Sequence, residues 1–170
     1  MSDDYFGIEG YEPAWQCGVR AVSATHGVRL ASLVGRTLTR AALLWDVEDD
    51  EWFADAPVVL DFEGEQVELQ HQKFDDLSLT WGSVDPGRPV RFLDFALRWR
   101  DDAVAELAAL QGQPLCEVEL LEWRGQDAAY EMVAVGFRFP QGRVTVQNGL
   151  DENDLSFAPP EPEYRRHALG

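Results

Sequence analysis

Acidic and aromatic side chains are concentrated in the segment DVEDDEWFAD, which runs from Asp46 to Asp55. Six carboxylates and no basic residue surround one adjacent pair of aromatic side chains. The simplest interpretation is a solvated loop between strands, but aromatic anchors inside a charged rim are typical of protein interfaces. We therefore expect this segment to bind a cationic protein partner. The predicted partner-binding residues are Asp46, Glu48, Asp49, Asp50, Glu51, Trp52, Phe53 and Asp55.

A second candidate site lies in the segment HQKFDD, where a histidine and the chain's only lysine occur close together. If the protein is an enzyme, His71 with Asp75 or Asp76 is the acid–base pair that the sequence offers. The corresponding function is a small-molecule- or metal-binding protein, or an enzyme, that uses a cleft between two halves of the molecule. No Gly-x-Ser-x-Gly motif or other nucleophile signature supports a defined reaction. We predict no catalytic residue with this sequence alone, and an enzyme is the less favoured interpretation.

The segment Asn148–Asp154 contains three carboxylates and two asparagine side chains, which are oxygen ligands of the kind that Ca²⁺ binds. Its spacing is not that of an EF-hand loop. A turn whose backbone is capped by Asn and Asp side chains explains the same residues. The three histidines, His26, His71 and His167, do not have the spacing of a metal site. We expect no metal and no cofactor, and the question of calcium in this loop stays open.

Two parts of the chain resemble each other in sequence. LVGRTLTRAALLWD (Leu33–Asp46) aligns with LQGQPLCEVELLEW (Leu110–Trp123), and Val58–Leu69 aligns with Ala134–Val146, placing Phe62 on Phe139. Asp76–Leu79 then aligns with Asp154–Phe157. A period near 77 residues is too long for a solenoid repeat and indicates an internal duplication within one domain.

Hydrophobic periodicity predicts the elements that position these segments. The alternation of apolar and polar residues predicts strands at 15–22, 38–45, 58–62, 66–70, 77–81, 95–100, 115–123, 135–139, 144–146 and 155–157. Helices are expected at 25–34, closed by Gly35, and at 103–110, with an N-cap from Asp101 or Asp102 and closure by Gly112. In the strand at 115–123 the face assignment is uncertain by one residue.

These elements predict an α+β fold, an internally duplicated domain built from two helix-plus-antiparallel-β halves related by a pseudo-two-fold axis, with both helices on one face. We expect a single globular domain over residues 1–157, with repeats at about 26–81 and 103–157. The proline-rich polar segment 158–170 is expected to be extended or frayed rather than packed.

The chain is strongly acidic, with 31 acidic and 14 basic residues and a formal net charge of −17. Residues 33–85 carry 13 acids against 3 bases. This balance disfavours nucleic acid and anionic membranes as partners and favours a cationic protein. The N-terminus lacks a signal-peptide pattern and no apolar run approaches a membrane span, so we expect a cytoplasmic protein; the oligomeric state cannot be predicted.

In size, acidity and lack of a catalytic motif, the chain resembles the bacterial immunity proteins that neutralise basic toxins. The resemblance rests on composition and implies an inhibitor that docks a cationic partner. A related hypothesis is nucleic-acid mimicry, in which spaced carboxylates imitate phosphates. A purely structural or oligomerising module is the remaining alternative.

Overall fold

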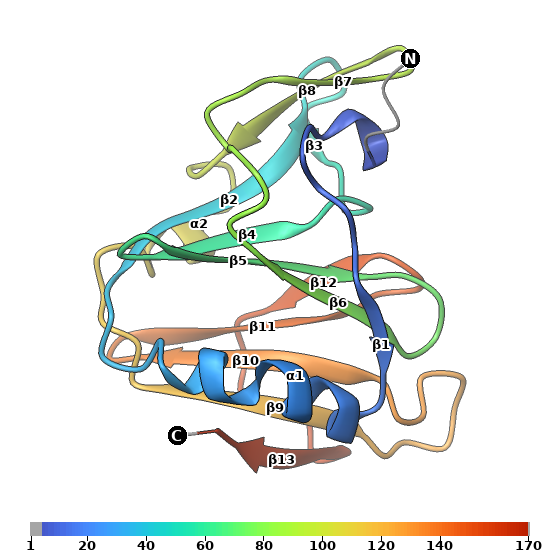
Figure 1. The fold of residues 1–170 in the computed structure, drawn as a ribbon, viewed down its shortest axis with the longest axis vertical. Helices are drawn as coiled ribbons and strands as arrows, with labels where there is room; N and C mark the ends of the chain where they lie inside the picture. Colours follow the sequence, from blue (N-terminus) through green and yellow to red (C-terminus); the bar gives the residue numbers. More distant parts are fainter. Residues whose placement is uncertain (1–4, 170) are drawn as a thin grey trace.

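Two antiparallel β-sheets make up most of the molecule (Figure 1). The computed structural model describes residues 5–169 of the chain. The first sheet contains β1 (Trp15–Cys17), β2 (Leu38–Asp46), β3 (Glu51–Trp52), β4 (Val58–Phe62), β5 (Glu65–His71), β6 (Asp76–Trp81), β7 (Val90–Phe92) and β8 (Phe95–Arg100). The second contains β9 (Glu117–Trp123), β10 (Val133–Phe139), β11 (Gly142–Asn148), β12 (Asn153–Ser156) and β13 (Tyr164–Ala168). The helical elements are η1 (Tyr5–Gly7), α1 (Val19–Ala31) and α2 (Ala105–Ala108). The predicted mixture of helix and antiparallel strand is confirmed, with strands predominating.

Both sheets contain a meander of four strands in the same order. In the first sheet the order is β6-β5-β4-β2, and in the second it is β12-β11-β10-β9. The predicted hairpins are present as β4–β5 and β10–β11. The segments that precede β2 and β9 also pair with each other, because Gly35 donates to Leu115 O and Gly112 donates to Leu38 O, both over 2.8 Å.

One hydrophobic core joins the two sheets. Since successive side chains of a strand point to opposite faces, Val118 and Leu120 of β9 enter this core while Glu117 and Glu119 face away from it. This settles the face of β9 that the sequence left uncertain. The ring of Phe62 in β4 is stacked 6.4 Å from that of Phe139 in β10, with 3° between the ring planes. Stacked phenylalanine rings therefore pack with leucine and valine side chains between the sheets.

The first helix begins and ends earlier than predicted. The expected strand at 15–22 stops at Cys17, and α1 occupies Val19–Ala31 instead of 25–34. Gly18 has φ 85°, a conformation that side-chain-bearing residues rarely adopt, and it separates the strand from the helix. Val22, His26 and Leu30 are buried at a spacing of four residues, which is one face of a helix.

The second helix is much shorter than predicted, at four residues instead of eight. Asp101 and Asp102 do not cap it: its N-cap is Val104, without a side-chain hydrogen bond, and the Asp102 carboxylate binds Arg100 at 3.1 Å. The chain leaves α2 through tighter turns, in which Leu110 donates to Leu107 O, and Gly112 follows with φ 87°. The two halves therefore have unequal helices.

The C-terminal segment is packed, so the expectation of a frayed tail is wrong. Strand β13 pairs with β9 along its whole length at the edge of the second sheet. The Tyr164 ring lies edge-on to Trp123 at 5.0 Å, and its hydroxyl donates to Gln147 Oε1 at 2.8 Å. These contacts satisfy the edge of β9. Within residues 5–169, no helix has both the length and the apolar character needed to cross a membrane.

Candidate functional site

The acidic segment predicted to bind a partner forms a hairpin between β2 and β3 and the connection to β4. Glu48, Asp49, Asp50 and Glu51 are exposed around its tip. Asp46 is buried, and its Oδ1 accepts backbone hydrogen bonds from Glu48 and Asp49 at 3.0 and 3.2 Å. Asp46 thus holds the turn in shape and leaves the other carboxylates to face solvent.

The aromatic pair of this segment faces the interior. Trp52 is partly buried against the main core. Phe53 packs in an aromatic cluster, with ring centroids 5.4 Å from Phe6, 6.0 Å from Phe95 and 6.3 Å from Phe92. Neither side chain stands free as an anchor, although the exposed carboxylates do form a charged rim.

The connection from β3 to β4 brings the two acid-rich segments of the sequence together. The backbone N–H of Asn153 donates to Ala54 O at 3.0 Å, and its side-chain Nδ2 donates to Ala56 O at 2.9 Å. Asp55, exposed between these contacts, lies near Glu152. Burial, and then the negative charges of Asp55 and Asp154, raise the pKa of the Glu152 carboxyl. Partial burial also raises the pKa of Asp55.

Two turns, 72–75 between β5 and β6 and 149–152 between β11 and β12, meet on this side of the molecule, at the right of Figure 1. We call them the paired turns. The side-chain amide of Asn148 donates to Gln72 O at 2.6 Å and to Phe74 O at 3.0 Å. In return, Asp151 Oδ1 accepts the backbone N–H of Phe74 at 3.3 Å. The asparagine therefore acts as a turn cap, as the simpler of the two sequence interpretations predicted.

Each of the paired turns presents a large apolar side chain to solvent. Phe74 is 62% exposed and Leu150 is 97% exposed. Both have positive φ, 51° and 59°, which is unfavourable for residues of this size. Backbone strain of this kind persists where the surrounding structure imposes it and is often found at functional sites. Here the capped turns hold two apolar side chains outward.

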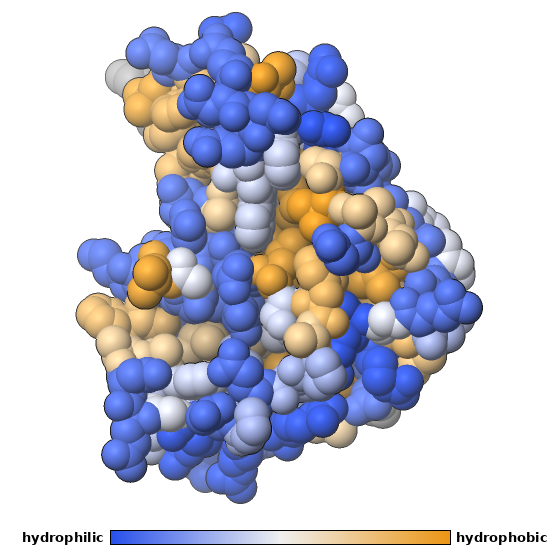
Figure 2. Space-filling model, turned by 180° about the vertical axis from the view of Figure 1, so that it is seen from behind, coloured by the Kyte–Doolittle hydropathy of each residue, from blue (hydrophilic) through white to orange (hydrophobic). Residues whose placement is uncertain are grey.

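Exposed apolar side chains are limited in number on the described surface. Seen from behind, apolar atoms gather near the middle of the molecule and at several places along its left edge, with hydrophilic atoms around them (Figure 2). Among residues 5–169 the exposed large hydrophobic side chains are Val28, Val47, Phe74, Leu93, Phe95, Tyr130 and Leu150. Phe74 and Leu150 are distinguished by lying on adjacent turns that carry carboxylates.

The carboxylates around the paired turns lack cationic partners. Within the described part of the chain, no lysine, arginine or histidine nitrogen lies within 4.0 Å of the carboxylates of Asp55, Asp75, Asp151, Glu152 or Asp154. Lys73, exposed in the same turn as Phe74, offsets one of these charges without forming an ion pair, so the paired turns remain negative.

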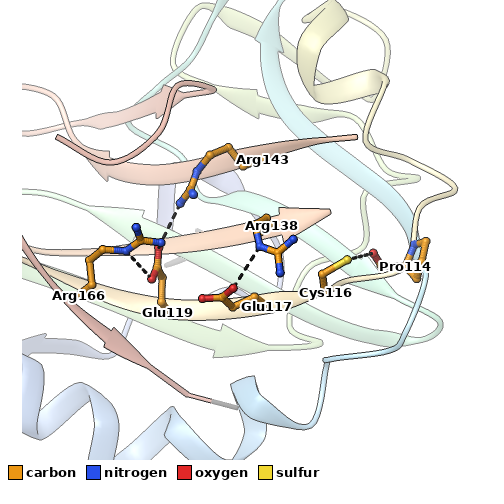
Figure 3. Close-up of polar contacts among 7 residues, drawn as sticks. All are labelled: Pro114, Cys116, Glu117, Glu119, Arg138, Arg143 and Arg166. Carbon is orange, nitrogen blue, oxygen red and sulfur yellow. Dashed lines mark hydrogen bonds and ion pairs between the residues drawn. The ribbon is translucent and has the colours of Figure 1, made fainter. Parts of the chain in front are cut away.

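Three basic side chains on the second sheet, Arg138, Arg143 and Arg166, are by contrast paired with carboxylates (Figure 3). Glu119, 3% exposed, accepts from Arg166 at 2.9 and 3.0 Å and from Arg143 at 3.2 Å. Arg138 and Glu117 form a neighbouring pair at 3.1 Å. These arginines are held in ion pairs on the second sheet, whereas the carboxylates at the paired turns have none, so the surface of the paired turns is negative.

The alternative site at His71 is not assembled as an acid–base pair. The imidazole is buried, with Nδ1 3.0 Å from Asn153 Oδ1 and Nε2 2.9 Å from Val133 O. Burial lowers the pKa of His71, and the two oxygen contacts oppose this only in part. Asp76 instead accepts from the Cys17 thiol at 3.0 Å and from Gln72 at 2.9 Å. The histidine is a structural link between the sheets.

Two clusters among the described residues have ligand atoms close enough for a single metal ion: Cys17 with Asp75 and Asp76, and Asp46 with Asp49 and Glu51. In both, hydrogen bonds within the protein already use the central carboxylate, Asp76 or Asp46. The geometry therefore has an explanation without an ion.

Sequence reasoning did not identify Phe74 and Leu150 as site residues. The available signal was a lone apolar residue inside a polar turn, in QKFDD and in NGLDEN. That signal becomes specific only when the two turns are seen to touch. Comparison of the chain with protein-family models, curated proteins and solved structures found no match.

Proposed function

We propose that this chain is a binding protein that docks a cationic protein through the paired turns and the neighbouring Asp55. The observation that carries the proposal is the presence of two exposed apolar side chains, Phe74 and Leu150, among carboxylates with no cationic partner. A few side chains that lose water on binding, often aromatic ones, provide most of the affinity in protein interfaces. The surrounding carboxylates would speed association with a positively charged surface and disfavour other partners.

The acidic hairpin between β2 and β3 fits the same proposal. Its exposed residues Glu48, Asp49, Asp50 and Glu51 extend the negative field of the connection that also carries Asp55. Charges outside the contact act through long-range steering, which raises the association rate more than the affinity. We assign Trp52 and Phe53 to packing, and Phe74 with Leu150 to anchoring.

The biological role that we infer is inhibition of a basic protein, in the manner of an immunity protein that covers a cationic active site. The net charge of −17 and the resemblance in composition support this role. Nucleic-acid mimicry is the nearest alternative, and competition by duplex DNA distinguishes it. An enzyme with a cleft between the sheets is less favoured, because Phe62, Phe137 and Phe139 fill that space.

We also propose that the two meanders arose by internal duplication and are related by a pseudo-two-fold axis. Two observations support this proposal. The hydrogen bonds Gly35 to Leu115 and Gly112 to Leu38 are exchanged between aligned positions, as a two-fold relation requires. The aligned residues Phe62 and Phe139 stack on each other, which is expected near such an axis.

The proposed function is tested by capture of basic proteins from a lysate of the source organism at low salt, followed by salt elution and mass spectrometry. The matched baits are the wild-type chain, the site variant Asp55→Asn/Asp151→Asn/Glu152→Gln, and the control variant Asp101→Asn/Glu106→Gln/Glu161→Gln. The control residues are exposed and outside the paired turns, and both variants lose three negative charges. We expect a basic protein to bind the wild type and the control but not the site variant. Equal capture by all three baits would reject the site.

A further inference from the structure

A groove of about 660 Å³ lies between the first turns of α1 and the strands β9 and β13, and no residue of the paired turns lines it. Its lining includes three of the chain's arginines, Arg20, Arg124 and Arg165, together with His167 and a single carboxylate, Glu122. Val19, Ser23 and Ala24 complete it. In a chain with a net charge of −17, this is a local concentration of positive charge.

The groove arginines are not neutralised by the carboxylate beside them. In the part of the chain that the structure describes, neither Arg20 nor Arg165 has a carboxylate oxygen within 4.0 Å. Arg124 lies 3.8 Å from Glu122 and places its guanidinium 4.9 Å from the centre of the Tyr130 ring. Three guanidinium groups against one carboxylate leave the groove cationic.

A buried polar atom at the groove also lacks a partner. Nε2 of His167 has no hydrogen bond within the described structure, although it is shielded from solvent. The nearest carboxylate oxygen, Glu122 Oε1, is 3.7 Å away, beyond hydrogen-bond distance. Buried polar atoms are normally hydrogen-bonded, so this ring nitrogen has unused capacity for a hydrogen bond at the groove.

The first turn of α1 adds donors on the same side. Gly18, at the N-cap, provides no side-chain cap, and Val19 and Arg20 open the helix at the groove. The N–H groups of a first turn have no partner within the helix and favour negative charge. They supplement the arginines here and do not define the site by themselves.

We propose that this groove binds a phosphorylated small molecule through Arg20, Arg165 and Arg124. Guanidinium groups match phosphate oxygens in geometry and form charge-assisted hydrogen bonds with them. A multiply charged phosphoryl group gains more from several arginines than a monovalent anion does. The site shares no lining residue with the paired turns, so its test is independent of the proposed protein partner.

The test measures pyrophosphate binding by calorimetry and by ¹H–¹⁵N chemical shifts, at constant ionic strength, with acetate as the monovalent comparison. The site variant is Arg20→Gln/Arg165→Gln. The control is Arg91→Gln/Arg98→Gln, which removes two exposed arginines outside this groove and changes the net charge equally. We expect pyrophosphate to change the chemical shifts of the Val19 and Arg20 amides. The site variant should bind pyrophosphate at least about tenfold more weakly than the wild type, and the control should bind it as tightly as the wild type.

Three results would overturn the proposal: no pyrophosphate binding by the wild type, equal weakening in the site and control variants, or shifts confined to residues outside α1, β9 and β13. Equal weakening would mean that only the overall charge matters. Circular dichroism of both variants checks that the fold is retained. We expect it to be retained because the substituted side chains are exposed.

Discussion

Asn153 is the residue that ties the two sheets together at the candidate surface. It is 2% exposed, and its Oδ1 accepts the backbone N–H of His71 at 3.0 Å. Its Nδ2 donates to Ala56 O at 2.9 Å and to Leu69 O at 3.1 Å. Since the amide can donate only through nitrogen, these bonds fix its orientation and direct its oxygen to His71. The pH dependence of stability follows from this arrangement.

We expect the free energy of unfolding to fall as the pH decreases below about 6.5, in part because of His71. Its folded-state pKa is lowered by burial, so the unfolded chain takes up the proton first as the pH falls. This coupling costs up to about 1.4 kcal/mol per pH unit until the folded-state pKa is reached. The variant His71→Gln removes the contribution of His71. Burial also lowers the pKa of His26, but this histidine is present in both proteins and contributes equally to both slopes. Urea unfolding between pH 7 and 5 should show a shallower slope in the variant; identical slopes would contradict this role.

We expect Leu150 to contribute to partner binding while lowering the stability of the fold. Its side chain is almost fully exposed and its φ of 59° is strained for leucine. Asparagine tolerates this conformation better, so Leu150→Asn should raise the free energy of unfolding by about 0.5–1 kcal/mol and weaken partner binding. Denaturant unfolding measures the first effect. A destabilised variant would instead mean that Leu150 packs within the fold.

At the scale of elements, the strands could be predicted far better than the helices. The alternation in Val58–Phe62 and Val133–Phe139 predicts strands, because every second side chain enters the main core, although Val59 and Ala134 are also buried on the opposite face. The region from Trp15 to Val22 allowed two interpretations, since its apolar residues fit a strand and also the start of a helix. The positive φ of Gly18 decides between them, and no local pattern reveals it.

The stacked pair Phe62 and Phe139 offers a test of how the sheets pack. Each ring is buried, so each change to alanine should cost about 3–5 kcal/mol. Because the rings touch, the double variant should deviate from additivity by about 0.5–1.5 kcal/mol. Phe62→Ala with Phe95→Ala is the control cycle, since Phe95 lies in a different cluster. Additivity in both cycles would indicate that the stacking contributes no specific energy.

At the scale of the whole molecule, the candidate surface depends on contacts between distant parts of the sequence. Asn148 reaches Gln72 and Phe74 across more than seventy residues, and Asn153 reaches Ala56 across 97. The sequence identified both acidic segments but gave no means of bringing them together. Sequence reasoning also predicted Trp52 and Phe53 as anchors. Both pack inward, because the type of an aromatic residue does not reveal whether its side chain is exposed.

The packing of the C-terminal segment has a similar explanation. Prolines at 159, 160 and 162 indicate an unpaired chain, and they do precede the strand. Residues 164–168 pair with β9, a partner more than forty residues earlier, and Arg166 binds the buried Glu119. The proline-rich composition therefore indicated the segment before β13 but did not predict the strand itself.

In the proposed function, carboxylates beside Phe74 and Leu150 attract and hold a cationic partner. The most direct test of this claim is the association rate of the captured basic protein as a function of salt, for the wild type, for Asp55→Asn/Asp151→Asn/Glu152→Gln and for the matched Asp101→Asn/Glu106→Gln/Glu161→Gln control. We predict slower association and a flatter salt dependence in the site variant than in the control, because nearby charges steer the encounter. Equal rates and equal salt dependence in the two variants would contradict the claim.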